Sequence, residues 1–353
     1  MTNYRNTYAN INLSNLKHNY KTLTNFSNKS IFGVVKANAY GHGIYEISKQ
    51  LEDLSCDYLC VSSIDEAIYL RKKNIRTPIL VIGYTDSRFV EVAVKNKITL
   101  TVSSIDNLNE YIKTNRNLTI HIKIDTGMNR IGIKKLGEYQ EALDNIKKSK
   151  LNLEGIFTHF YNSDGDIKDS IRQINYFYSM IDSCEYKYKW IHTSNSDATI
   201  REIDHRSNAC RCGLSLYGIK GIKSSIDIKP VLSLYSEIIH VKELFPGETI
   251  GYGATYKVQE KQIIATVPIG YGDGFIRKNQ GRFLCVDGHP CEIVGRVCMD
   301  QLMIKIDSFY PIGTPVEIIG EHISLDNMSK ELNMIPYEVL TLLNSRINRK
   351  YIL

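Results

Sequence analysis

The sequence lacks several features that would assign it to a specialised class of proteins. No apolar run is long enough to span a bilayer, and the polar N-terminal residues hold no apolar core of a secretion signal. The net charge of +6 is spread over 353 residues, without the basic blocks and interleaved aromatics typical of nucleic-acid binding. This charge does favour anionic ligands. We therefore expect a globular chain with no membrane contact and no nucleic-acid partner.

The sequence also has too few cysteines for a disulfide framework: eight in the whole chain, none of them in a Cys-x-x-Cys pair. Cys210 and Cys212 stand two apart in an apolar run, where one face of a strand explains them better than a zinc site. The sequence therefore predicts reduced thiols, a cytoplasmic protein and no metal site.

Short apolar runs alternate with amphipathic helices over the first part of the chain. Ser63 followed by Glu66 predicts a capping box at the start of one helix, and further helices are expected over 136–148 and 167–183. The expected strands span 31–37, 58–62, 78–82, 98–102, 120–125, 155–160, 190–194 and 208–212. Such an alternation is typical of an α/β protein with a (β/α)8 TIM barrel. A doubly wound sheet fits less well, because no Gly-x-Gly-x-x-Gly turn follows the first strand.

After residue 229 the pattern changes to successive strands separated by tight turns. These strands are expected at 231–241, 263–268, 282–286, 291–297, 302–306 and 315–319. We therefore predict a barrel domain over 1–229 and a mainly antiparallel β domain over 230–353 that ends in a helical tail at 324–346. A short strand at 10–13 precedes the barrel and is a candidate to pack with the β domain.

A lysine stands where the first barrel strand ends. Lys36 closes the apolar run 31–35 and is followed by the small, turn-prone residues 37–39 and by Tyr40. Burying a lysine there is costly unless it is neutral, paired or covalently used. Desolvation would lower its pKa and make it a nucleophile able to form a Schiff base. A lysine that simply reaches solvent from a strand end fits these residues equally well.

Other polar residues fall at the ends of the later barrel strands, which is where the active site of a TIM barrel lies. They are Lys123 and Asp125, followed by Arg130, at the fifth strand, His159 at the sixth, residues 194–196 at the seventh and Arg211 at the eighth. Each has an ordinary explanation when taken alone, such as a satisfied histidine or a surface arginine. Together they indicate one active site at the barrel mouth.

The segment 35–43, Val-Lys-Ala-Asn-Ala-Tyr-Gly-His-Gly, resembles the cofactor-lysine motif of the PLP-dependent alanine racemase family nearly residue for residue. Segments 123–130, 251–256, 269–274 and 298–301 resemble further motifs of this family, so the resemblance covers almost the whole chain. It implies an amino-acid racemase with pyridoxal 5′-phosphate as cofactor and a homodimer with shared active sites. It also implies a supply of D-amino acids for peptidoglycan precursors.

The resemblance implies two catalytic bases, because inversion requires a proton to be taken from one face of a carbon and returned to the other. Lys36 would hold the cofactor and act as one base, and Tyr252 of the other subunit would be the second. Glycines flank Tyr252, and a hairpin with two ordinary tyrosines, Tyr252 and Tyr256, fits these residues as well.

The resemblance also implies binding roles for further residues. The cofactor-binding residues would be Tyr40, Asn195, Ser196, Gly213 and Leu214 at the phosphate, Arg211 at the ring nitrogen, and His159, which would orient Arg211. The substrate-binding residues would be Arg130, Lys123, Tyr271 and Met299. Arg130 would hold the substrate carboxylate, and carbamylation of Lys123 would turn a cation into an anion that fixes this arginine.

Arg211 separates the competing functions. An arginine at the ring nitrogen leaves it unprotonated and makes the cofactor a shallower electron sink, which suits a racemase. A PLP-dependent decarboxylase of the same fold would instead need an acidic residue there. A non-catalytic PLP-binding protein would resemble the barrel alone, and a metal-dependent hydrolase would need more ligands than His159 and Asp125.

Two departures from the family pattern bear on the substrate. Residues 161–170 resemble the racemase domain of membrane-anchored serine/alanine racemases from vancomycin-resistance clusters, which would make the chain the cytoplasmic domain of a longer protein. Aligning on Arg346 puts Ser345, or Asn344 with a slip of one residue, where many alanine racemases have an aromatic. A pocket built for alanine cannot strongly reject an added hydroxyl. We therefore expect appreciable serine racemisation beside alanine racemisation.

Overall fold

The computed structural model describes residues 4–353, which divide into two compact units. The barrel unit comprises Ser14–Ala39 and Gly43–Lys229. The β unit comprises Pro230–Leu353 together with Tyr40–His42 and the described residues up to Leu13. No helix within residues 4–353 is both long enough and apolar enough to cross a membrane.

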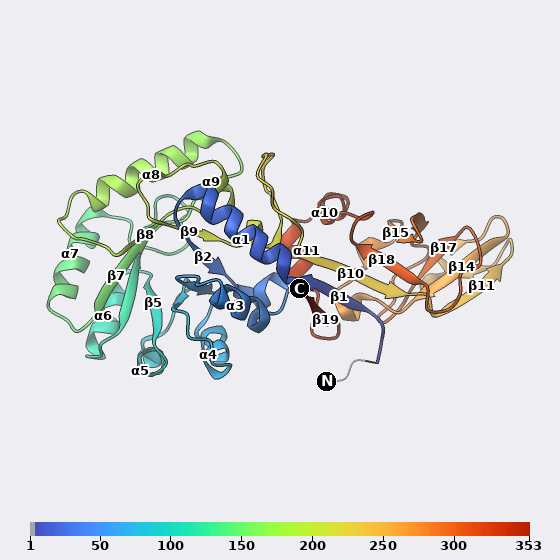
Figure 1. Ribbon diagram of the computed structural model, residues 1–353, viewed down its shortest axis with the longest axis horizontal. Coiled ribbons are helices and arrows are strands. Elements are labelled where there is room, and N and C mark those ends of the chain that lie inside the picture. The colour runs from blue at the N-terminus through green and yellow to red at the C-terminus, as the bar shows by residue number, and fades with distance from the viewer. Residues whose placement is uncertain (1–3) are drawn as a thin grey trace. The chain divides into compact units, whose positions relative to one another are not determined.

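The barrel unit is a closed barrel of parallel strands, β2 to β9 in chain order, with helices around its outside (Figure 1). The strands are β2 (Ser30–Val34), β3 (Leu59–Val61), β4 (Ile79–Val81), β5 (Ile98–Val102), β6 (Thr119–Lys123), β7 (Asn152–Phe157), β8 (Trp190–His192) and β9 (Ala209–Cys212). The helices are α1 (Leu13–Ser27), α3 (Ile44–Asp53), α4 (Ile64–Lys72), α5 (Val90–Lys95), α6 (Ile105–Lys113), α7 (Leu136–Lys147), α8 (Ile167–Ile181) and α9 (Ser196–Ile200). This arrangement confirms the predicted TIM barrel and excludes the open sheet.

Apolar sequence explains the layers of the barrel. Every residue of β3, β4 and β5 is buried, because one face of each strand fills the barrel and the other packs under helices. The covering helices bury one stripe each: α8 turns Ile174, Phe177 and Ile181 inward at helical spacing.

The predicted capping box at α4 is half right. Ser63 is the N-cap, and its hydroxyl oxygen accepts a hydrogen bond from the Glu66 N–H at 3.4 Å. The Glu66 carboxylate does not return to the Ser63 backbone. It accepts instead from the N–H and hydroxyl of Ser62, both at 2.8 Å, and from the N–H of Ala37 at 2.6 Å. Glu66 therefore ties α4 to the turn that follows Lys36.

Several predicted strands run too far at their carboxyl ends. β2 ends at Val34 rather than at residue 37, and β7 ends at Phe157 rather than at 160. Lys36 consequently begins the short left-handed turn labelled α2 (Lys36–Tyr40), His159 and Asn195 lie on loops just beyond their strands, and Arg211 lies inside β9. Apolar character continues past each strand end because the loop residues are also buried, so hydrophobicity alone does not locate the end.

The β unit contains a six-stranded sheet in the order β16-β15-β18-β10-β1-β19, a three-stranded sheet β11-β14-β17 and the pair β12-β13. The strands are β1 (Tyr8–Asn12), β10 (Leu232–Glu237), β11 (His240–Leu244), β12 (Thr249–Ile250), β13 (Tyr256–Lys257), β14 (Gln262–Val267), β15 (Phe283–Val286), β16 (His289–Glu292), β17 (Leu302–Ile306), β18 (Pro315–Ile319) and β19 (Asn348–Ile352). The paired strands are antiparallel except β1 and β19, which are parallel. This confirms a mainly antiparallel β domain.

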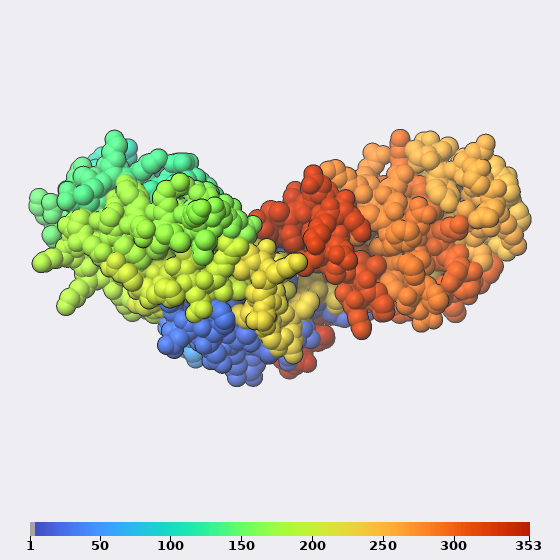
Figure 2. Space-filling model, turned by 90° about the horizontal axis from the view of Figure 1, so that it is seen from above, coloured from blue at the N-terminus to red at the C-terminus, as the bar shows by residue number. Residues whose placement is uncertain are grey.

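Three predictions for the β unit are wrong in detail. The strand expected at 231–241 is two strands in different sheets, β10 and β11, and the strand expected at 291–297 ends at Glu292. The tail is two helices, α10 (Leu325–Leu332) and α11 (Pro336–Leu342), followed by β19. In the space-filling view these C-terminal residues, in red, lie on the surface of the unit (Figure 2). The sequence did not predict β19, because its residues, Asn-Arg-Lys-Tyr-Ile, are mostly polar.

Gly155 of β7 lies against the ring of His121, and a Cβ at this position would come within 2.7 Å of two ring atoms. We expect Gly155→Ala to lower the free energy of unfolding by about 1–3 kcal/mol, because the packed barrel has no room for the methyl group. Urea denaturation followed by circular dichroism measures this. Gly137→Ala in α7 is the control, since nothing lies within 4 Å of its Cβ. Equal stability of Gly155→Ala and wild type would contradict the expectation.

Candidate active site

The residues predicted from the barrel strands share one end of the barrel. The carboxyl ends of all parallel strands in a barrel point to the same mouth. The residues found there are Lys36 after β2, Lys123 at the end of β6, His159 after β7, Asn195 and Ser196 after β8, and Arg211, Gly213 and Leu214 in or just after β9. The predicted convergence at one mouth is therefore observed.

The turn that follows Lys36 has an uncommon backbone. Ala37, Asn38, Ala39 and Tyr40 have φ values of 51°, 54°, 52° and 52°, a left-handed conformation that is disfavoured for residues other than glycine. Hydrogen bonds hold the turn: the Asn38 side-chain oxygen accepts from the Ile44 N–H, and the Asn38 carbonyl from the Gly43 N–H, both at 2.9 Å. Together with the Glu66 contact, these bonds over-determine a strained segment, as is common at functional sites.

Four cations influence one another at the barrel mouth. Burial lowers the pKa of Lys36, and the positive charge of Arg130 lowers it further, against a smaller opposite effect of Glu66. Burial, followed by Arg130 and Arg211, lowers the pKa of Lys123 to about 8. Lys123 donates a hydrogen bond to the Ile131 carbonyl at 3.0 Å. The mouth thus combines positive charge with amines that lose their protons more easily than ordinary lysines.

Arg211 is buried, with 4% of its surface exposed. Nη1 donates to His192 Nδ1 at 2.9 Å and to the His192 carbonyl at 2.5 Å. Nη2 lies 2.6 Å from the Thr158 carbonyl, 3.2 Å from the Thr193 carbonyl and 3.3 Å from His159 Nδ1. Burial lowers the pKa of Arg211 to about 10, so it remains charged near neutral pH. Within the described chain, its Nε–H is the donor that no protein acceptor takes.

Polar groups gather around Ser196. Its hydroxyl oxygen accepts hydrogen bonds from the N–H groups of Gly213 and Ser215, both at 3.2 Å. The neighbouring Asn195 is the N-cap of α9, and its side-chain oxygen accepts from the Ala198 N–H at 3.0 Å and from the Ser163 hydroxyl at 2.8 Å. Hydroxyl and backbone N–H groups on successive loops suit a phosphate group.

Arg130 is exposed, and the loop that carries it is shaped by Asp125. One Asp125 carboxylate oxygen accepts from the N–H groups of Gly127 and Asn129, both at 3.0 Å. Asp125 therefore has a structural use on this loop. Within residues 4–353, no group of three or more His, Cys, Asp and Glu side chains is arranged to hold a metal ion.

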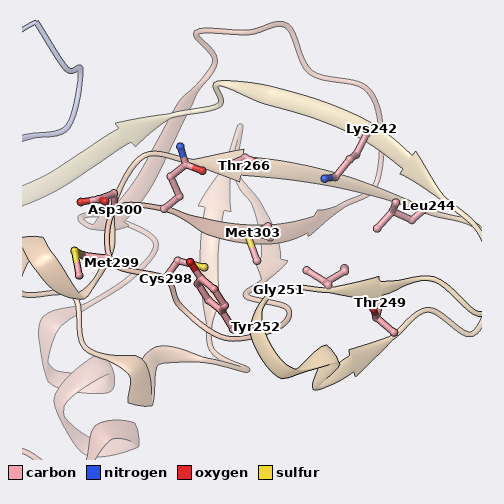
Figure 3. Close-up of a pocket in the computed structure, with 12 residues that line it drawn as sticks. Lys242, Leu244, Thr249, Gly251, Tyr252, Thr266, Cys298, Met299, Asp300 and Met303 are labelled. Atoms are coloured by element: carbon pink, nitrogen blue, oxygen red, sulfur yellow. The ribbon is translucent and has the colours of Figure 1, made fainter.

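The β unit brings Tyr252 and Met299 to one open pocket of about 650 Å³ (Figure 3). Tyr252 follows Gly251 on a short 3-10 turn, Tyr252–Ala254, and 71% of its surface is exposed. The positive φ values of Gly251 and Gly253, 71° and 74°, explain why glycines flank it. The segment is the loop of an antiparallel pair, β12 with β13, so the hairpin expected from the sequence is present and Tyr252 is an exposed residue of its loop.

Tyr271 and Met299 lie on segments that are bonded to each other. The N–H of Tyr271 donates to the Cys298 carbonyl at 3.0 Å, and the N–H of Gly272 donates to the Met299 carbonyl at 2.8 Å. The buried Asp273 pairs with Arg5 at 2.6 Å and with Arg346 at 3.3 Å. The chain's two ends thereby hold the segment that carries Tyr271.

Asn344 and Ser345, the two candidates for the altered position, have different surroundings. The Asn344 amide donates to the Gly272 carbonyl at 2.8 Å and accepts from the Arg346 N–H at 2.9 Å, so both of its ends are occupied. Asn344 is therefore held by backbone groups, whereas Ser345 is exposed.

Tyr40 belongs to the β unit, where its ring lies 6.4 Å from the Tyr337 ring. The next residues are held by the tail: Arg349 donates to the Gly41 carbonyl at 3.0 Å, and the Tyr351 hydroxyl donates to the His42 carbonyl at 3.2 Å. Sequence reasoning did not anticipate this use of the tail.

Sequence reasoning also missed two buried histidines of the barrel interior, His121 and His192, and the partly buried Glu154 beside them. His121 and His192 are fully buried and hydrogen-bonded to each other, Nδ1 to Nε2, at 2.9 Å. The available signal was a histidine inside each of two apolar strands, β6 and β8. A lone histidine of this kind is usually a satisfied core residue, so the signal was weak.

Comparisons with known proteins agree over the full chain. The model of the alanine racemase N-terminal domain matches residues 11–221, and that of the C-terminal domain matches residues 231–351. A curated alanine racemase from Streptococcus suis is 39% identical over 360 residues, covering 98% of each chain. One from Lactococcus lactis is 40% identical over 363 residues, covering 99% of this chain and 98% of its own.

Solved structures show the same likeness. The alanine racemase of E. faecalis superposes with a TM-score of 0.96 at 35% identity, covering 99% of each chain. That of Bacillus anthracis with bound L-Ala-P gives 0.93 at 35% identity, covering 99% of this chain and 96% of its own. A histidine racemase from Leuconostoc mesenteroides gives 0.93 at 27% identity, covering 99% of each chain. The chain therefore belongs to the alanine racemase family, whose cofactor is pyridoxal 5′-phosphate.

Proposed function

We propose that this protein interconverts L- and D-alanine, with Lys36 and Tyr252 as its two catalytic bases. The observation that carries the proposal is Lys36, a partly buried amine of lowered pKa at the barrel mouth, in a chain that matches alanine racemases over 98% of its length. Residues 1–229 form the cofactor domain in this proposal, and residues 230–353 supply Tyr252.

The residues of the barrel mouth fit pyridoxal phosphate. The amine of Lys36 would bind its aldehyde carbon, and Ser196 with the N–H groups around it would receive the phosphate. Asn195, Leu214 and Tyr40 complete the phosphate contacts in this proposal. When bound, the cofactor delocalises the electron pair left by removal of the α-proton.

Arg211 would face the cofactor's ring nitrogen. Its terminal N–H groups are occupied by protein acceptors, so Nε–H is the donor left for a ligand. A guanidinium of pKa about 10 donates a hydrogen bond without giving up its proton, which leaves the ring nitrogen unprotonated. The bound cofactor would then be a shallower electron sink, and the substrate carbon would regain a proton sooner, which would favour racemisation over competing reactions. His159, beside Nη2, helps to fix the guanidinium.

The two bases would act from opposite faces of the substrate. Lys36 would move the proton on one face, and Tyr252 of the partner subunit would move it on the other. An exposed phenol on a glycine-flanked turn is suited to reaching another chain, so we propose a head-to-tail homodimer with shared sites. Tyr271 and Met299, on the bonded segments beside it, would line the partner's entrance.

We further propose a cytoplasmic setting and a role in supplying D-alanine for peptidoglycan precursors. All eight cysteines are free, and Cys60, Cys210 and Cys212 are buried beside the site, which suits a reducing compartment.

Lys36→Ala should abolish the visible absorption of bound cofactor, because no other amine is proposed to bind it. Tyr252→Phe should keep this absorption but lower racemisation by about 10²-fold or more, since one face loses its acid/base group. Absorption spectra and chiral product analysis measure both. Tyr256→Phe is the matched control, because the Tyr256 hydroxyl only donates to Gln262 at 3.0 Å. Full-speed racemisation by Tyr252→Phe in both directions would refute the second base.

We propose serine as a second substrate, because the exposed Ser345 can meet a substrate hydroxyl. We expect kcat/KM for L-serine above about one hundredth of that for L-alanine, since one hydroxyl is weakly excluded from a small pocket. Ser345→Tyr should lower the serine-to-alanine ratio while alanine turnover persists. A serine value below that limit in the wild type would remove the proposal.

We propose that Lys123 is carbamylated: its neutral amine adds carbon dioxide, forming an N–C bond and releasing one proton, and the resulting anion pairs with Arg130. With a pKa of about 8, roughly one tenth of the amine is neutral at pH 7. ¹³C-bicarbonate should give a carbamate NMR signal that weakens as the pH falls below about 8, where the amine is protonated. Lys123→Ala should lose the signal and raise KM for alanine. Identical spectra of the two proteins would contradict carbamylation.

A further inference from the structure

The barrel interior holds a row of polar side chains that leads away from the mouth. His192 Nδ1 meets Arg211, and His192 Nε2 lies 2.9 Å from His121 Nδ1. His121 Nε2 lies 3.5 Å from Glu154 Oε2, a charge contact longer than a good hydrogen bond. Glu154 lies in β7 three residues before its carboxyl end, so the row runs from the mouth toward the other end of the barrel.

The hydrogen bonds at the Arg211 end of this row fix its direction, and the charge of Glu154 favours the same direction. A guanidinium can only donate, so His192 Nδ1 must accept from Arg211. A neutral imidazole that accepts at one nitrogen donates from the other, so His192 Nε2–H points to His121 Nδ1. His121 Nε2–H then faces the Glu154 carboxylate at 3.5 Å, which is an electrostatic contact, since Nε2 has no hydrogen-bond partner within residues 4–353. Burial lowers the pKa of both His121 and His192, so both rings are neutral near pH 7.

Glu154 stays ionised at its end of the row. Besides His121, its neighbours are Lys189, which donates to Oε1 at 2.8 Å, and the Tyr58 hydroxyl, which donates to Oε2 and contacts the Thr99 hydroxyl at 3.0 Å. The His121 contact, with those of Lys189 and Tyr58, lowers the pKa of Glu154 to about 2. The carboxylate is therefore a permanent negative charge facing the His121 ring.

Packing leaves the rings little freedom. Phe157 stacks on His192 with ring centres 4.8 Å apart and planes 10° from parallel. The same ring lies 5.1 Å from the Arg211 guanidinium carbon. Gly155 makes room for His121, since a side chain there would collide with the imidazole. The packed side chains of the row cannot reorient, so a change of tautomer at one histidine requires a change of tautomer at the histidine bonded to it.

We propose that Glu154 is a positioning residue for Arg211, which acts by fixing His121 and His192 in the tautomer that leaves His192 Nδ1 as an acceptor. If the tautomers reversed, an N–H of His192 would face an N–H of Arg211, and the guanidinium would shift. The proposal rests on the proposed function, in which Arg211 faces the cofactor's ring nitrogen.

Glu154→Gln removes the charge with little change of shape. In ¹⁵N-histidine-labelled holoenzyme, we expect Nε2–H tautomers at both rings of the wild type and a changed or mixed population in the variant. The visible absorption of the bound cofactor should shift, and kcat should fall by roughly 2- to 30-fold with KM little changed. Glu154→Asp, which keeps the charge, should retain the wild-type tautomers.

Lys189→Met is the matched control, because it removes a cation from the same carboxylate and leaves the row intact. Wild-type tautomers and absorption in Glu154→Gln would overturn the proposal, as would an equal shift in Lys189→Met. If Glu154→Gln does not fold, His121→Gln interrupts the row at its middle, and wild-type absorption in that protein has the same meaning. Wild-type protein that binds no pyridoxal phosphate would instead refute the proposed function, while its histidine tautomers would still report on Glu154.

Discussion

The burial of one guanidinium, that of Arg211, is the constraint on which the rest of the barrel interior depends. A charge taken out of water must recover its lost hydration from fixed partners. Among the residues that the structure describes, no carboxylate contacts Arg211; its acceptors are two imidazole nitrogens and three backbone carbonyls. These acceptors belong to residues at or just after the carboxyl ends of β7 and β8. The positions at which these two strands end therefore bring the acceptors within reach of the buried guanidinium.

This constraint also sets the charge of the mouth. With no carboxylate directly on Arg211, its positive field reaches Lys36 and Lys123, and together with Arg130 it makes both amines easier to deprotonate. The positive charge of Arg211 therefore has two effects: it attracts anionic groups to the mouth, and it makes the amines of the mouth more reactive. The same fold carries a histidine racemase at 27% identity, so side chains at the mouth, rather than the architecture, must decide the substrate.

The sequence predicted the architecture well because short apolar runs mark the strands of both units: β5 of the barrel and β17 and β18 of the β unit fall at their predicted bounds. It failed where contacts between distant segments decide the outcome. The position of Glu66 in the sequence predicts a capping box, but its carboxylate accepts a hydrogen bond from the turn after Lys36. His121 and His192 lie on different strands, so no local sequence pattern predicts their hydrogen bond. β19 is polar and becomes a strand only because β1 offers it an edge.

The sheet order of the β unit has a consequence for biosynthesis. β1 lies between β10 and β19, with Tyr8 paired to Tyr235 on one side and to Asn348 on the other. Both partners are translated long after β1, when the whole barrel sequence has already emerged from the ribosome. Pairing of strands that are distant in sequence is slow, and a strand that stays unpaired can meanwhile form incorrect pairs or aggregate. In a nascent chain, β1 therefore lacks its partner β19 until residues 348–352 have been synthesised.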